Sequence, residues 1–107
     1  NHVVMMGNND DLCYDVLSGR YFNSNIDKIK KAMNDMNYRL LNDNILSLNE
    51  FYNEIGLQST DIGYEKGWNI SDGMIDISFS SIISDNDQPC IVMHFENEPK
   101  YKFDRFC

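Results

Sequence analysis

Residues 25–42 carry an apolar stripe with helical spacing, so the chain must fold with one long helix packed against a core. At about 100° per residue the stripe spans about 80° of a helix circumference, and it is too short for a coiled-coil seam. A second line of side chains alternates acid and base every four residues, which is typical of a solvated helix face. Ser24 or Asn25 can serve as the N-cap. The stripe consists of Ile26, Ile29, Met33, Met36 and Leu40.

A second helix is predicted from a capping box formed by Ser47 and Glu50. It runs through Ile55, and Gly56 suits the left-handed residue that follows a helix. The same stretch resembles the end of an EF-hand loop. However, the positions of its first three calcium ligands include only one carboxylate, Asp43, so a calcium site is excluded.

Two hairpins are predicted on either side of the helices. The first joins two β-prone runs through Ser18 and Gly19. The second begins at residues 74–80, where apolar and polar residues alternate, with a bulge expected near Ser80 and Ser81. It returns over residues 90–96. The residues expected to point inward are Ile75, Ile77, Phe79, Ile91, Met93 and Phe95.

The remaining segments are expected to be less regular. Residues 57–73 are interpreted as a long loop, and residues 101–103 as a short final strand or a tail packed on the sheet. Together the elements predict an α+β fold: an antiparallel sheet built from two hairpins, in β-β-α-α-β-β order, with two helices packed on one face. Residues 1–10 are interpreted as a loose lead-in and residues 11–107 as a single domain.

Composition excludes some classes of partner. The chain has 17 acidic and 9 basic residues, a net charge of −8, which argues against nucleic-acid binding. An apolar content of 42% supports a packed core, and no apolar run approaches the roughly 18 residues of a membrane span. The start at Asn1 without a Met indicates a fragment, and for this part of the protein we expect no membrane contact and a cytoplasmic location.

The three cysteines, Cys13, Cys90 and Cys107, match neither a disulfide framework nor a metal knuckle. Reduced thiols are the favoured interpretation. A Cys13–Cys90 bridge stays open if their strands are neighbours.

No catalytic, cofactor-binding or metal-binding residues are assigned. His94, Glu96 and Asp76 are expected on one polar sheet face, which is too few ligands for zinc because His2 lies in the lead-in. Cys90 has no activating group that the sequence identifies. No phosphate-binding loop, nucleophile elbow or metalloprotease motif is present.

The segment with Tyr64 and Trp68 is the candidate interaction surface. Long loops that carry aromatic residues and glycines are suited to binding. The alternative is that Trp68 folds back over the core. Gly63 and Gly67 lack the Lys-Ser/Thr of a phosphate loop and are interpreted as turn residues.

Several segments resemble an uncharacterised family encoded in phages and prophages of low-GC Gram-positive gut bacteria. The resemblance covers most of residues 12–99. It implies that this region is the C-terminal soluble part of a longer protein with hydrophobic, membrane-associated segments upstream. It implies no functional residues, because the family has no established activity. The matching segments are SGRYF (18–22) with the helix after it, SLNEFYNEIGL (47–57), TDIGYEKGW (60–68), DGMIDISFSS (72–81) and PCIVMHFE (89–96).

Three hypotheses follow. The first is a non-catalytic interaction or structural domain of phage origin, with a protein partner or self-association. The second is an acidic decoy that occupies a nucleic-acid-binding site on a host protein, which requires a continuous acidic stripe on the surface. The third is a small hydrolase that uses His94 with Asp76 or Cys90.

Overall fold

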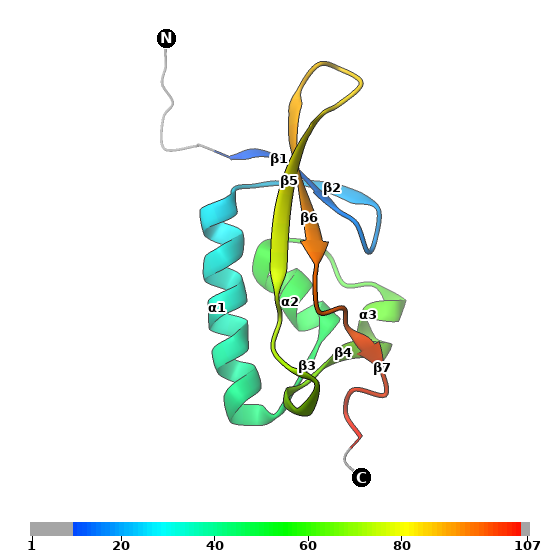
Figure 1. The fold of residues 1–107 in the computed structure, drawn as a ribbon. Helices are drawn as coiled ribbons and strands as arrows, with labels where there is room; N and C mark the ends of the chain where they lie inside the picture. Colours follow the sequence, from blue (N-terminus) through cyan, green and yellow to red (C-terminus); the bar gives the residue numbers. More distant parts are fainter. Residues whose placement is uncertain (1–9, 106–107) are drawn as a thin grey trace.

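Two β-sheets and three α-helices make up the fold, described by a computed structural model over residues 10–105 (Figure 1). The predicted α+β class is confirmed. Most of the predicted lead-in, His2 and Cys107 lie outside the described residues. The helices are α1 (Ile26–Asp43), α2 (Leu48–Ile55), α3 (Asp61–Glu65) and the 3-10 helix η1 (Ile70–Asp72). The strands are β1 (Asp11–Asp15), β2 (Arg20–Ser24), β3 (Ile45–Ser47), β4 (Lys66–Asn69), β5 (Ile77–Ile83), β6 (Pro89–Phe95) and β7 (Lys100–Tyr101).

The two predicted helices have the predicted caps. The Asn25 side chain accepts a hydrogen bond from the Lys28 amide at the start of α1, and the helix ends at Asn44 in the left-handed conformation. At α2 both hydrogen bonds of the capping box between Ser47 and Glu50 are present, and the helix is followed by left-handed Gly56. The buried residues of α1 are Ile29, Ala32, Met36 and Leu40.

The larger sheet has the strand order β2-β1-β6-β5. Both predicted hairpins are present, since β1 pairs with β2 and β5 pairs with β6, each pair antiparallel. The prediction of a wholly antiparallel sheet is wrong, because β1 and β6 join the hairpins as a parallel pair. A parallel pair needs a long crossover connection, and the chain from α1 to β4 provides it.

The smaller sheet has the order β3-β4-β7. It replaces the predicted long loop, because residues 57–73 contain α3, β4 and η1. These elements were not predicted because they are three to five residues long, too short for a periodic pattern. The extra elements also change the predicted β-β-α-α-β-β order.

The β5–β6 pairing is unbroken from Ile77 opposite Phe95 to Ile83 opposite Pro89. The predicted bulge near Ser80 and Ser81 is therefore wrong. The apparent shift in the apolar pattern has a simpler cause: β5 is exposed from Ser80 to its end. Figure 1 shows the tip of this hairpin extending past the rest of the described fold.

The cysteines of the larger sheet lie on neighbouring strands. Cys13 pairs with Ile91, and Cys90 pairs with Leu12, so the two are one position out of register. Both are buried free thiols. Burial raises the pKa of both thiols.

Candidate protein-interaction surface

Trp68 is a core residue, so its assignment to an interaction surface is wrong. It lies on β4 with 2% of its area exposed. Its ring stacks on Phe95 at 5.9 Å between centroids and packs edge-on against Phe51 at 6.0 Å. Its indole Nε1 donates to the Asn97 carbonyl at 2.8 Å. The alternative, that Trp68 folds back over the core, is the correct one.

Tyr64, the other predicted residue, is 67% exposed on α3. The position of α3 is fixed by Asn49, whose side-chain amide exchanges two hydrogen bonds with the backbone of Thr60 at 2.8 and 2.9 Å. Gly63 makes this docking feasible, because a Cβ at this position would lie 1.9 Å from the Asn49 Oδ1. Tyr64 therefore stands on a helix that is held firmly against α2.

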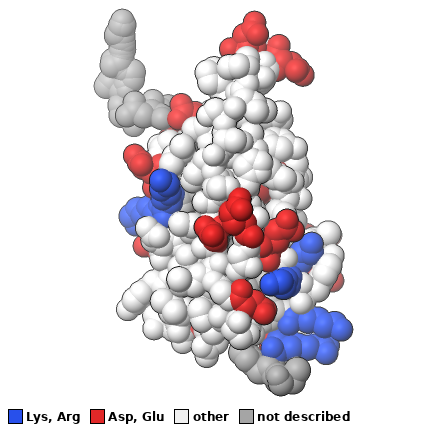
Figure 2. Space-filling model, in the orientation of Figure 1, with Lys and Arg blue, Asp and Glu red and all other residues white. Residues whose placement is uncertain are grey.

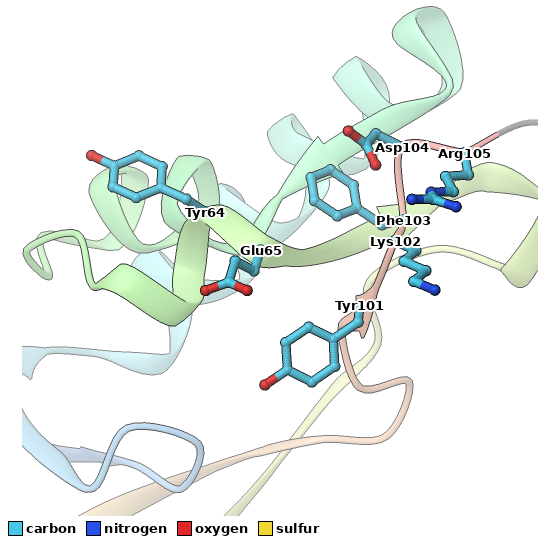
Figure 3. A pocket seen from close by; sticks show the side chains of 7 residues that line it. All are labelled: Tyr64, Glu65, Tyr101, Lys102, Phe103, Asp104 and Arg105. Carbon is cyan, nitrogen blue, oxygen red and sulfur yellow. The ribbon is translucent and has the colours of Figure 1, made fainter.

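A surface pocket of about 340 Å³ lies beside Tyr64, and we call it the Tyr64–Tyr101 pocket (Figure 3). One side comes from the end of α3, and the other from the end of β7 and the chain that follows it. Tyr101 is 55% exposed. Residues 101–105, which we call the C-terminal segment, carry both aromatic and charged side chains here (Figure 3). The lining residues are Tyr64, Glu65, Tyr101, Lys102, Phe103, Asp104 and Arg105.

The C-terminal segment is held against β4 by two contacts. The Asn69 side chain donates to the Phe103 carbonyl at 2.9 Å. A Cβ at Gly67 would lie 2.8 Å from the Phe103 ring and 2.2 Å from the Leu46 carbonyl oxygen, so only glycine allows this approach. Gly63 and Gly67 thus permit close packing at the two sides of the pocket.

Basic side chains gather at this end of an acidic molecule. Lys66 Nζ lies 4.8 Å from the centre of the Tyr101 ring, a cation–π contact. Lys66 and the segment from residue 100 to 105 carry four of the nine Lys and Arg residues. Figure 2 shows basic side chains gathered where the described chain ends, whereas acidic ones crowd the opposite tip of the molecule.

The acidic side chains on the face in Figure 2 form separate groups. A decoy of nucleic acid needs a continuous row of negative charge, and this face does not present one.

Among residues 10–105 no side-chain hydrogen bond joins His94 to Asp76 or Cys90, the pairings that the hydrolase hypothesis uses. His94 Nε2 lies 2.9 Å from the Ser80 hydroxyl, and Glu96 accepts from the Ser78 hydroxyl. Cys90 is fully buried, and burial raises the pKa of its thiol, which disfavours the reactive thiolate. Within residues 10–105 no three His, Cys, Asp or Glu side chains are grouped closely enough to hold a metal ion.

A buried polar network below the first hairpin was not predicted. Asp15 is fully buried and accepts from the Ser18 hydroxyl at 2.7 Å and the Ser18 amide at 3.1 Å. Arg20 Nε donates to the same hydroxyl at 2.8 Å, and its guanidinium lies 5.0 Å from the centre of the Tyr52 ring. The network joins the β1–β2 turn to α2.

Tyr52 makes the stability of the fold sensitive to alkaline pH. Burial, then the hydrogen bond and the charge of Asp15, raise the pKa of the Tyr52 hydroxyl above its ordinary value of about 10. This stabilisation is complete below pH about 10 and is lost as the pH rises, because the unfolded chain ionises first. We expect the free energy of unfolding to fall above pH 10 by up to about 1.4 kcal/mol per pH unit more steeply than in Tyr52→Phe. Urea denaturation at a series of pH values measures it; equal slopes in the two proteins would contradict it.

The described helices include none that is both long and apolar enough to cross a membrane. Comparisons with curated proteins and with solved structures find no significant match. Comparison with protein families finds a match over residues 1–104 to a family whose function is unknown. The chain therefore belongs to DUF6353, a family of unknown function.

Proposed function

We propose that this chain is a non-catalytic protein-interaction module that binds an acidic protein segment at the Tyr64–Tyr101 pocket. The observation that carries the proposal is the exposed Tyr101 ring with Lys66 against it. Lys102 and Arg105 line the same pocket. Exposed tyrosines and arginines are the residues that contribute most to binding energy at protein interfaces.

Charge favours an acidic partner at this end only. The chain as a whole carries a net charge of −8, so it repels acidic molecules over most of its surface. The pocket is lined by two cations and two anions, and Lys66 beside Tyr101 adds a third cation, so the repulsion is relieved here and the cations would orient the partner as it approaches. Glu65 and Asp104 at the same pocket would select for a partner that also offers hydrogen-bond donors.

The absence of catalysis is part of the proposal. It is supported by the burial of Cys90 and by the hydrogen bond of His94 to a serine hydroxyl on an open sheet face. A cytoplasmic location and an origin in a phage or prophage are further parts of it. The origin is supported by the resemblance of the five segments, and a gene that lies among phage genes would bear it out.

Capture of a partner with matched variants tests the proposal. The wild-type chain, the double variant Tyr64→Ala/Tyr101→Ala and the control Tyr38→Ala are immobilised and exposed to extract of the native host. Tyr38 is 69% exposed on α1, so its removal matches the loss of an exposed tyrosine at another surface. We expect a protein that is retained by the wild type and by Tyr38→Ala and is lost from the double variant. Partners retained equally by all three would contradict a role for the pocket.

A further inference from the structure

The β5 edge of the larger sheet has no neighbouring strand within residues 10–105, because β5 is the last strand in the order β2-β1-β6-β5. The strand is seven residues long, and it is exposed from Ser80 onward. Ile82 and Ile83 are 48% and 65% exposed. Long, apolar edge strands pair readily with other chains, and proteins generally protect them.

The register shows which backbone groups of β5 point outward. The Glu96 amide donates to the Asp76 carbonyl at 2.8 Å, so residue 76 faces β6. In an antiparallel ladder every second residue faces the same neighbour, so the even-numbered residues of β5 bond with β6. The N–H and C=O groups of the odd-numbered residues point to the open side. These residues are Ile77, Phe79, Ser81 and Ile83.

Two residues before β5 begins, at Ile75, the same outward edge is already covered. The Asn37 side chain of α1 accepts from the Ile75 amide at 2.8 Å and donates to the Ile75 carbonyl at 2.9 Å. The side-chain amide of Asn37 thus bonds to both backbone groups of Ile75, as a neighbouring strand would. No described backbone group pairs in this way with Phe79, Ser81 or Ile83. The edge is therefore protected at its beginning and open along the projecting hairpin.

We propose that β5 pairs with β5 of a second copy of this chain, antiparallel and about a two-fold axis at Ser80. This register uses all of the outward groups, with Ile77 opposite Ile83 and Phe79 opposite Ser81. It joins two four-stranded sheets into one sheet of eight strands. This register does not use Ile75, so the hydrogen bonds between its backbone and the Asn37 side chain of α1 are kept.

The charge distribution favours a second copy as the occupant. Two chains of charge −8 repel each other least where neither presents acids, and β5 has no charged residue between Asp76 and Asp85. The two-fold register places Asp76 opposite Ser84 of the other copy, so no acid faces an acid directly. The opposite sheet edge, β2, is less suited to pairing because it includes Arg20 and leads directly into α1.

Sedimentation of three proteins tests the proposal: wild type, Ser81→Lys and Asn42→Lys. A lysine at Ser81 places like charges close together across the two-fold axis, whereas Asn42 is an exposed position on α1 that adds the same charge elsewhere. We expect wild type and Asn42→Lys to reach twice the 12.5 kDa mass of one chain, and Ser81→Lys to dimerise at least about tenfold more weakly. Dimers that Ser81→Lys leaves unchanged would place the interface elsewhere and overturn the proposal.

Two further measurements keep the result interpretable. In a Cys107→Ser background, Ser80→Cys should form a disulfide-linked dimer on mild oxidation, whereas Asn42→Cys should not. Amide exchange at Phe79 and Ser81 should slow as the protein concentration rises. A protein that stays monomeric at all concentrations overturns the proposal. Slow exchange of the Phe79 and Ser81 amides in that monomer would show that another part of the same chain covers the β5 edge. The outcome is independent of the pocket, because Ser81→Lys leaves Tyr64 and Tyr101 in place.

Discussion

Trp68→Ala is expected to lower the free energy of unfolding by about 3–5 kcal/mol. The indole is 2% exposed and contacts Phe51 and Phe95, so its removal leaves a cavity between α2 and the two sheets. The change also leaves the Asn97 carbonyl without its indole donor. Urea denaturation followed by circular dichroism measures the loss.

Two controls separate the core role of Trp68 from a surface role. Trp68→Phe keeps most of the apolar contact and should lose less stability than Trp68→Ala. Tyr64→Ala, at a residue that is 67% exposed, should change the free energy of unfolding by no more than about 0.5 kcal/mol. Equal effects of Trp68→Ala and Tyr64→Ala would contradict the placement of Trp68 in the core.

Asp15→Ala is expected to lower the free energy of unfolding by about 3 kcal/mol, because two partly buried donors of Ser18 lose their acceptor together. The Asp15 carboxylate is fully buried, and both the amide and the hydroxyl of Ser18 donate to it. The Ser18 hydroxyl also accepts from Arg20, so the loss should spread through the network to the contact of Arg20 with Tyr52. The measurement is the midpoint and slope of urea denaturation at pH 7.

The control for this prediction is Asp15→Asn, which keeps the shape of the side chain and one acceptor oxygen, so its cost should be smaller. Val16→Ala, at a residue that is 46% exposed, should have a small effect. An Asp15→Ala protein as stable as Val16→Ala would show that the network does not hold the β1–β2 turn to α2.

The elements that could be predicted are those in which local chemistry and packing agree. The apolar stripe predicts α1 and the Ser47–Glu50 capping box predicts α2, each from residues close together in the sequence. Both helices begin at the expected N-caps. The β1–β6 pairing was not predictable in direction, because it joins strands far apart in the chain and depends on the path of the whole crossover. The smaller sheet was also not predictable from the sequence, because β3 and β7 have only three and two residues.

The candidate site could be predicted only in part. The exposure of Tyr64 follows from its place on a short surface helix, but the burial of Trp68 depends on β4 pairing with β3. The sequence does not predict that Tyr101 lines a pocket, although Lys100 and Lys102 alternate with aromatic residues. That alternation shows a strand-like segment, and only the fold brings it beside α3.

Nuclear magnetic resonance measures whether the Tyr64–Tyr101 pocket binds acidic protein segments. The ¹⁵N-labelled chain is titrated with a short glutamate-rich peptide and, separately, with a lysine-rich peptide of the same length. We expect chemical-shift changes for the glutamate-rich peptide alone, confined to Tyr64, Lys66 and residues 101–105, and their loss in Tyr101→Ala. Shifts spread over the surface, or equal shifts with the lysine-rich peptide, would contradict it.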